Sequence, residues 1–192
     1  MTALIVAPHC DDAELGCSMV AKGARLAVVS ANDGARWEEQ VQGAAWMGVA
    51  DTMRAGFPDG EVVHDRHLVG FIELALTGCD VVYSPPLADT HQDHAAVARA
   101  VISAARRSPV GIIEYETPSV LPSWEPNWWV PMTPTDLDEQ HLALSCHVSQ
   151  HDRPYFSPHW LGNRAMFRGQ QVGVPFAQTF RVVRAVRQGG FL

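Results

Sequence analysis

Two short clusters of histidine and aspartate are the residues of this chain whose types and spacing could do chemistry. The first is His9-Cys10-Asp11-Asp12, and the second runs from Asp89 to His94 and contains His91 and Asp93. Neither has the paired cysteines of a structural zinc site, whereas His and Asp ligands that leave one position to water are typical of catalytic zinc. Such an ion supplies hydroxide near neutral pH and polarises a carbonyl. The adjacent carboxylates could then divide the work, one on the metal and one as general base.

Each cluster by itself also has a simpler interpretation. A His-x-Asp-Asp run after a strand is more often helix capping and turn chemistry, and His-x-Asp-His alone favours neither reading. Finding both in one small domain, each shortly after an expected strand, favours the metal site, because ligands bind at the carboxyl ends of strands in open α/β sheets.

The elements that must position these clusters alternate through the first 116 residues. Apolar runs predict strands at 3–7, 25–30, 79–84 and 110–116, with a weaker one at 52–56, and helical periodicity predicts helices at 14–24, 37–47, 68–77 and 94–106. Repeated strand-then-helix units predict an α/β fold with a Rossmann-like open, mostly parallel sheet and helices on both faces.

The remaining residues, 117–192, are expected to elaborate the same single domain, since 192 residues suit one domain. The proline- and tryptophan-rich stretch 118–134 is expected to be irregular, of the kind that forms lids or binding walls. Its Trp124, Trp128 and Trp129 could stack on a sugar ring or an acyl chain, or could pack in the core. Helices at 136–146 and 160–169 and a closing strand at 179–186 are expected to follow.

Composition excludes several classes of function. Acidic residues outnumber basic ones 21 to 14, giving a net charge of −7 and no basic patch, so no nucleic-acid partner is expected. No apolar run reaches the length of a membrane span, and the first residues do not read as a signal peptide. The four scattered cysteines suit reduced thiols, so a cytoplasmic protein is expected.

The two clusters, with further motifs, resemble the LmbE-like (PIG-L) family of zinc-dependent de-N-acetylases. The family's first motif, His-Pro-Asp-Asp-Glu extended by Leu-Gly-Cys-Gly, corresponds to residues 9–18, and its His-x-Asp-His motif corresponds to residues 91–94. Weaker matches follow in order at 32–39, 56–60, 126–128, 147–150 and 167–177, so the resemblance covers residues 3 to 184.

The resemblance implies an LmbE-like fold and hydrolytic removal of the acetyl group from N-acetylglucosamine-type units, which in the family belong to lipids, thiol precursors and antibiotics, giving acetate and a free amine. The implied partner is a small-molecule N-acetylated sugar conjugate. It implies Zn²⁺ as cofactor, although Fe²⁺ or Co²⁺ could use the same ligands. The implied metal ligands are His9, Asp12 and His94. The other implied roles are a general base (Asp11), an oxyanion stabiliser or proton donor to the leaving amine (His91), a carboxylate that orients a histidine (Asp93), and contacts to sugar hydroxyls (Arg36 and Asp59).

Four positions depart from the family pattern. Cys10 replaces the usual proline, Ala13 replaces the usual glutamate, and Gln140 and Gln178 stand where a lysine and a glutamate are expected, which suggests a lost ion pair. None removes an implied ligand or base, so the departures bear on the substrate rather than on the chemistry. The short chain predicts an open cleft that takes a bulky conjugate.

Other interpretations remain open from the sequence. The chain could be an amidohydrolase of a non-sugar N-acyl substrate, or a non-catalytic homologue that binds metal or sugar, although binding alone does not need Asp11. Cys10 could be a nucleophile, but the neighbouring carboxylates would raise its pKa. His147 could reach the site or satisfy a backbone group. The oligomeric state is not predicted.

Overall fold

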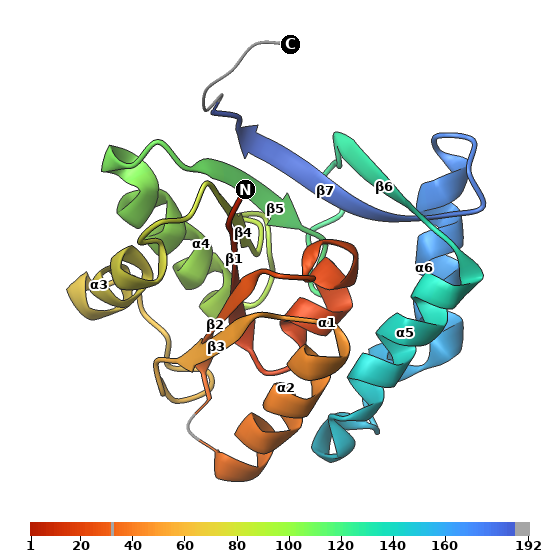
Figure 1. The fold of residues 1–192 in the computed structure, drawn as a ribbon, viewed down its shortest axis with the longest axis horizontal. Coiled ribbons are helices and arrows are strands. Elements are labelled where there is room, and N and C mark those ends of the chain that lie inside the picture. The colour runs from red at the N-terminus through yellow and green to blue at the C-terminus, as the bar shows by residue number, and fades with distance from the viewer. Residues whose placement is uncertain (32, 187–192) are drawn as a thin grey trace.

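The computed structural model, which describes residues 1–31 and 33–186, is built on a seven-stranded sheet with helices on both faces (Figure 1). The strands are β1 (Ala3–His9), β2 (Arg25–Ser30), β3 (Asp51–Arg54), β4 (Val81–Ser84), β5 (Gly111–Tyr115), β6 (Trp128–Met132) and β7 (Phe176–Arg184). The α-helices are α1 (Asp12–Cys17), α2 (Gly34–Trp46), α3 (Arg66–Ala75), α4 (Gln92–Ala104), α5 (Pro134–Ser145) and α6 (Pro158–Gln170). Short 3₁₀ turns lie at Ser18–Val20, Ala105–Arg107, Val148–Gln150 and Pro154–Phe156.

The strand order explains where a ligand should bind. The order is β3-β2-β1-β4-β5-β7-β6, in which the first five strands are parallel and β7 runs antiparallel to both β5 and β6. The chain starts in the centre with β1, moves outward through β2 and β3, and then crosses to β4 on the other side of β1. This reversal leaves a crevice beyond the carboxyl ends of β1 and β4, the usual ligand site of such sheets. The predicted Rossmann-like α/β fold is confirmed.

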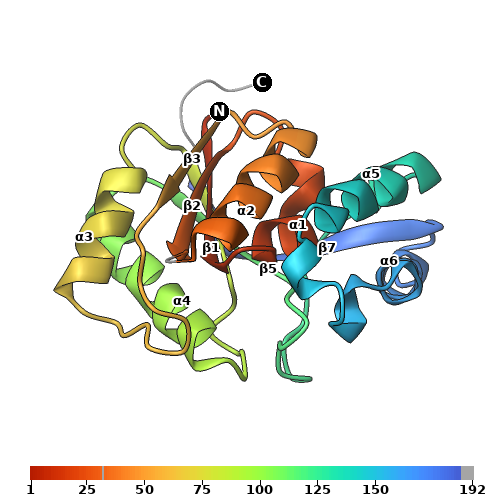
Figure 2. The same ribbon diagram turned by 90° about the horizontal axis from the view of Figure 1, so that it is seen from below.

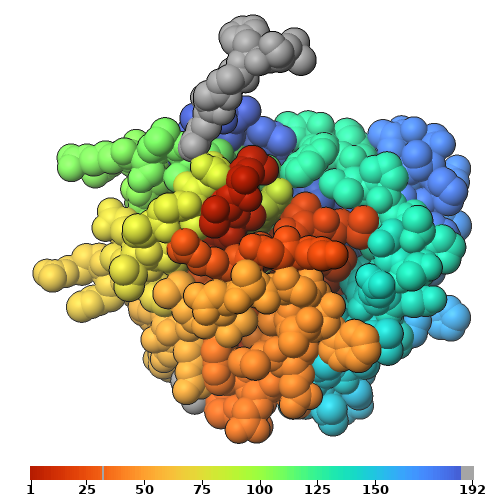
Figure 3. Space-filling view, viewed as in Figure 1, coloured from red at the N-terminus to blue at the C-terminus, as the bar shows by residue number. Residues whose placement is uncertain are grey.

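Alternating side chains of the parallel strands form two apolar layers. Leu4 and Val6 of β1 pack toward α3 and α4, and Ile5 and Ala7 pack toward α1 and α2. Figure 2 shows α3 and α4 on one side of the sheet and α1, α2 and α5 on the other. Helix α5 lies directly against α2 (Figure 3), so the later part of the chain is packed onto the first helices.

The first predicted helix is longer than the observed one. The helix expected at 14–24 stops at Cys17 and continues as a 3₁₀ turn. Gln178 of β7 holds that turn, because its Oε1 accepts the Met19 N–H at 3.0 Å and its Nε2 donates to Ser18 Oγ at 3.1 Å. Of the expected turn at 32–34, Asn32 lies outside the described residues.

The stretch 118–134 is not wholly irregular, because it contains strand β6. Pro131 is tolerated there since β6 is an edge strand, where a missing N–H costs no ladder hydrogen bond. The indole of Trp128 packs 5.1 Å from the ring of Phe180, and Trp124 Nε1 donates to Glu114 Oε2 at 2.9 Å. Trp129 Nε1 donates to Gln171 at 3.4 Å. The three tryptophans therefore pack within the fold, and none is among the described residues that line the pocket below.

The C-terminal segments are tied to the same sheet. Strand β7 pairs with β5, and Arg168 of α6 holds Glu116, just after β5, through hydrogen bonds of 2.7 to 3.2 Å. In the part of the chain that the structure describes, no helix has the length and apolar character needed to span a membrane.

Candidate metal centre

Three buried donor atoms form a nearly equilateral triangle at the carboxyl end of the sheet. His9 Nδ1 lies 3.2 Å from His94 Nε2, and each of these nitrogens lies 3.4 Å from Asp12 Oδ2. A tetrahedral zinc ion about 2.0–2.1 Å from each N or O ligand would hold its ligands about 3.4 Å apart. The side chains present therefore fit a small divalent ion with one position left open.

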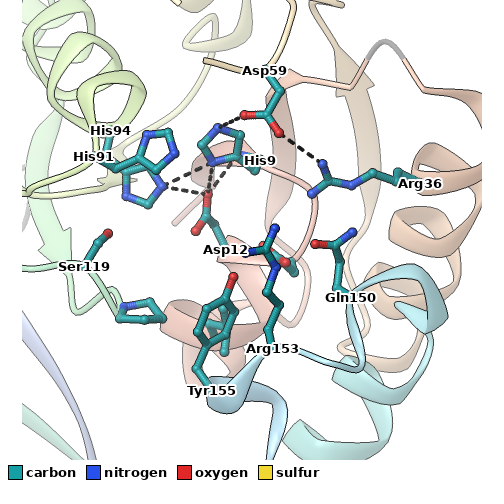
Figure 4. A pocket seen from close by; sticks show the side chains of 13 residues that line it. His9, Asp12, Arg36, Asp59, His91, His94, Ser119, Gln150, Arg153 and Tyr155 are labelled. Atoms are coloured by element: carbon teal, nitrogen blue, oxygen red, sulfur yellow. Dashed lines mark hydrogen bonds and ion pairs between the residues drawn. The ribbon is translucent and has the colours of Figure 1, made fainter.

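The fold brings these residues together because β1 and β4 are neighbours that end at the same edge. His9 is the last residue of β1, and Asp12 is the first of α1. His94 lies in the first turn of α4, which follows β4. The His9 N–H also donates to Asp12 Oδ2 at 2.8 Å, which fixes the turn between strand and helix. Figure 4 shows the rings and the carboxylate converging on one point.

Each histidine of the triangle has a carboxylate behind it. His9 Nε2 lies 3.0 Å from Asp93 Oδ2, which also accepts the Gly60 N–H at 2.8 Å. His94 Nδ1 lies 2.9 Å from Asp89 Oδ2. Such partners fix the ring orientation and raise the basicity of the ligand. The sequence predicted this role for Asp93 but gave none to Asp89, although Asp89 belongs to the second cluster.

The carboxylates and histidines of the cluster shift one another's pKa values toward the charged forms. Burial raises the pKa of Asp12, but the facing His94 and the hydrogen bond with His9 outweigh it and hold that pKa well below its usual range. Burial lowers the pKa of His94, yet Asp12 and Asp89 raise it to about 10. The pKa of His9 is also raised, because Asp12 and Asp93 outweigh the effect of burial. Without a metal the cluster therefore holds protons where a cation would bind, and metal binding must release them.

Asp11 lies beside the triangle in a strained conformation. It precedes α1 with a φ of 105°, and it is the one non-glycine residue with positive φ among residues 1–31 and 33–186. Its N–H donates to Gln40 Oε1 at 3.0 Å. Burial, together with the charge of Asp12, raises the pKa of Asp11 to about 7, although His147 and Arg36 oppose this. A carboxylate that titrates near 7 is suited to general base catalysis.

His91 presents its ring to the same space. It caps α4, and its Nδ1 accepts the Asp93 N–H at 3.2 Å, which assigns the ring hydrogen to Nε2. Its ring stacks on that of His94 with centroids 4.9 Å apart. Burial lowers the pKa of His91, and the neighbouring His9 and His94 lower it further. The neutral ring is therefore a hydrogen-bond donor toward the pocket at neutral pH.

Arg36 and Asp59 form the rim of the site. Arg36 comes from α2, and Asp59 comes from the loop between β3 and α3. Arg36 Nη1 donates to Asp59 Oδ2 at 3.3 Å, and Asp59 Oδ1 lies 3.2 Å from His9 Nε2. The structure thus brings the two predicted sugar-contact residues together at the mouth of the predicted metal site.

These residues line a cavity of about 220 Å³ whose other wall comes from the C-terminal part of the chain. That wall includes Gln150, Arg153 and Tyr155 (Figure 4), which the sequence did not single out as site residues. It is anchored on α2, because Glu39 accepts hydrogen bonds from Ser149 N at 2.9 Å and Ser149 Oγ at 2.6 Å. The weaker family match at residues 147–150 was the sequence signal that could have predicted this wall.

Three other sequence interpretations are corrected or decided by the packing. Cys10 is buried, and burial raises the pKa of its thiol to about 12, so it is not a thiolate nucleophile. His147 is fully buried and is not among the described pocket residues. At the two positions where a lost ion pair was suggested, the glutamines have separate partners: Gln140 Nε2 donates to the carbonyl oxygens of Glu14 at 2.9 Å and Leu15 at 3.2 Å, and Gln178 binds Ser18 and Met19.

The site combines histidine and aspartate donors around an open position with a carboxylate whose pKa is near neutral. Metal-dependent hydrolases use this combination. Comparisons with known proteins assign the family. The model of the family described as PIG-L, GlcNAc-PI de-N-acetylase, matches residues 4–105. The uncharacterized deacetylase YaiS of Escherichia coli (strain K12) is 33% identical over 167 residues, covering 76% of this chain and 90% of that protein. The chain belongs to the PIG-L family of de-N-acetylases.

Two solved structures show the same fold. The conserved protein TT1542 from Thermus thermophilus superposes with a TM-score of 0.83 at 23% identity, covering 97% of this chain and 96% of the other. N,N'-diacetylchitobiose deacetylase from Pyrococcus horikoshii superposes with a TM-score of 0.79 at 20% identity, covering 95% of this chain and 84% of the other.

Proposed function

We propose that this deacetylase removes the acetyl group from an N-acetylglucosamine-type unit of a small conjugate, with zinc held by His9, Asp12 and His94. The observation that carries the proposal is the triangle of donor atoms, with sides of 3.2 to 3.4 Å, beside Asp11. When bound, the ion supplies Lewis acidity that polarises an amide carbonyl and lowers the pKa of water. Histidine with carboxylate favours zinc, although Fe²⁺ and Co²⁺ accept the same ligands.

Asp11 is the proposed general base. Its carboxylate lines the pocket, and its pKa of about 7 leaves a substantial ionised fraction at neutral pH. It accepts a proton from the water that attacks the acetamide carbon. The C–N bond then breaks, the nitrogen takes up a proton, and acetate and a free amine leave.

His91 is the proposed partner of the carbonyl oxygen. Because Nδ1 accepts the Asp93 N–H, the ring directs an N–H at Nε2 into the site, where it can donate to the oxygen as negative charge develops. Its lowered pKa keeps it neutral, so it acts first as a hydrogen-bond donor.

The sugar is proposed to bind at the rim. The Arg36 and Asp59 side chains are 21% and 54% exposed, and both keep free hydrogen-bonding capacity next to the pocket. A guanidinium beside a carboxylate offers donors and acceptors at the spacing of neighbouring hydroxyls. Gln150 and Arg153 would meet the rest of the conjugate. The N,N'-diacetylchitobiose deacetylase, which has the same fold, acts by its name on an acetylated sugar, and this supports the assignment.

The experiment is acetate release by the zinc-loaded protein from N-acetylglucosamine conjugates and from N-acetyl amides that lack a sugar. Asp11→Asn should bind zinc normally and lose about 10²- to 10⁴-fold in kcat, the usual worth of a general base. Asp51→Asn, an exposed carboxylate at the start of β3, is the matched control and should be unchanged.

The alternatives make different predictions in the same assay. Release from the non-sugar amides alone would replace the sugar assignment with a general amidohydrolase, and Arg36→Met should then leave KM unchanged. No release from any compound by the metal-loaded protein would contradict the enzymatic role of this site.

A further inference from the structure

A buried polar network lies behind the pocket, between α1, α2 and α5, and the chemistry proposed above does not use it. It consists of Glu14, Gln40 and His147, each with 0% of its surface exposed. Gln40 Nε2 donates to Glu14 Oε1 at 2.7 Å, and that oxygen lies 3.4 Å from His147 Nε2. The other end of the same amide, Gln40 Oε1, accepts the N–H of Asp11 at 3.0 Å.

This buried network is only partly hydrogen-bonded. The second carboxylate oxygen of Glu14 and both ring nitrogens of His147 make no hydrogen bond within the described part of the chain. Buried polar groups without full pairing cost free energy, and an apolar set of similar volume is often more stable.

Gly43 adds to this cost. A Cβ at Gly43 would lie 2.5 Å from Glu14 Oε1 and 3.0 Å from His147 Nε2, so only glycine leaves room for the pair. Glycine inside a helix is less favourable than alanine, because it loses more backbone freedom on folding. Features that lower stability in two ways suggest a role other than stability.

The contacts show what the network can do. A carboxylate only accepts hydrogen bonds, so Glu14 makes Gln40 turn its NH₂ toward it and its carbonyl oxygen toward Asp11. Asp11 needs such a partner, because a non-glycine residue at a φ of 105° is strained and persists only where its surroundings hold it.

We propose that Gln40, oriented by Glu14, is a positioning residue that holds Asp11 in its left-handed conformation and so aims the Asp11 carboxylate at the attacking water. This inference rests on the proposed role of Asp11 as general base. Glu14 and Gln40 then act through Asp11 and do not themselves touch the substrate.

The first test is Gln40→Met, which keeps the length of the side chain and removes both hydrogen bonds. We expect kcat to fall about 10- to 100-fold, because a small misplacement of a catalytic group costs that much. KM and bound zinc should stay within about twofold of wild type. Gln42→Met, on the exposed side of the same helix, should change nothing. An unchanged kcat, or an equal loss of metal binding, would overturn the proposal.

The second test exchanges donor and acceptor. In the single variant Gln40→Glu, the new carboxylate faces that of Glu14 across the 2.7 Å contact. We expect its kcat to fall at least as far as in Gln40→Met. In the double variant E14Q/Q40E, the new carboxylate at position 40 accepts both the Asp11 N–H and the new amide at position 14. We expect kcat to return to within about threefold of wild type. A folded, zinc-bound double variant with low kcat would overturn the proposal, and this arm decides the question even if Gln40→Met does not fold.

Asp11→Asn, measured in parallel, separates this inference from the proposed function. If Asp11→Asn retains activity, Asp11 is not the base, so its proposed role and the positioning role of Gln40 both fail, while the acetate released still supports the deacetylase. If Asp11→Asn is inactive while Gln40→Met matches wild type in kcat, the proposed function stands and only the positioning role of Gln40 fails.

Discussion

Asp89→Asn removes the charge behind His94 while keeping the size of the side chain. Asp89 Oδ2 accepts hydrogen bonds from His94 Nδ1 at 2.9 Å and from Thr117 Oγ1 at 2.5 Å, and Oδ1 accepts the His91 N–H at 2.8 Å. Asparagine has one acceptor oxygen and one NH₂ group, so in either orientation an N–H donor faces the NH₂. We therefore expect both metal affinity and stability to fall.

The magnitude follows from these contacts. Losing the carboxylate behind a ligand histidine typically weakens metal binding about 10- to 100-fold, which is about 1.4–2.7 kcal/mol. One buried donor left without a partner costs about 1–3 kcal/mol of folding free energy. Asp93→Asn should weaken metal binding less than Asp89→Asn, because Asp59 Oδ1 remains 3.2 Å from the same His9 nitrogen.

The assay is competition for Zn²⁺ with a chromophoric chelator, with the free energy of unfolding measured by urea on the metal-free protein. Asp80→Asn is the matched control, because Asp80 lies just before β4, at the end opposite to the site, and accepts the Thr2 N–H at 2.7 Å. Its zinc affinity should equal that of wild type. A folded Asp89→Asn protein with a Kd within about twofold of wild type would refute the reasoning.

Two further predictions concern groups outside the triangle of ligands. Cys10→Ala should keep kcat within about twofold, because burial raises the pKa of this thiol to about 12; inactivation by a thiol reagent in step with labelling of Cys10 would contradict this. Arg168→Met should cost about 3 kcal/mol at pH 7, because it removes the ion-pair partner of the buried Glu116 carboxylate and leaves it the hydrogen bond from the Thr179 hydroxyl. Burial raises the pKa of Glu116, but Arg168, Arg164 and Thr179 lower it below its ordinary value, so the pair stabilises the fold above about pH 4.5 and less as the pH falls. The free energy of unfolding, measured by urea at pH 7 and pH 4, should therefore differ less between variant and wild type at pH 4. An equal difference at both pH values would count against the ion pair.

The residues of the metal site could be predicted because they are close in sequence and follow strands. His9, Asp11 and Asp12 occupy one turn, and His91 and His94 occupy another, so the carboxyl edge of a parallel sheet is enough to bring them together. Gln40 could not be found in this way, because its role depends on which way a side chain of α2 points toward α1.

The pocket wall and the edge of the sheet were missed for related reasons. Arg153 and Tyr155 come after helix α5, which packs on α2, and no local sequence pattern predicts that packing. Strand β6 contains Pro131 and adjacent tryptophans, which read as a loop, but an edge strand paired with β7 tolerates both. Local patterns thus predicted the parallel core, whereas long-range packing formed the antiparallel edge.

Helix α1 explains why the departures from the family pattern leave the proposed chemistry in place. Ala13 is fully buried on the core face of α1, and side-chain hydrogen bonds hold the C-terminal end of this helix: Gln140 donates to the Leu15 carbonyl at 3.2 Å, and Gln178 binds the turn that follows. Arg164 also donates to Leu15 O at 2.5 Å. Since Asp12 opens this helix, any set of contacts that fixes α1 also fixes the metal ligand. The pocket wall packs on the same helix, because Tyr155 and Phe156 belong with Leu15 of α1 to one apolar cluster, so the wall and the Asp12 side of the site share a support.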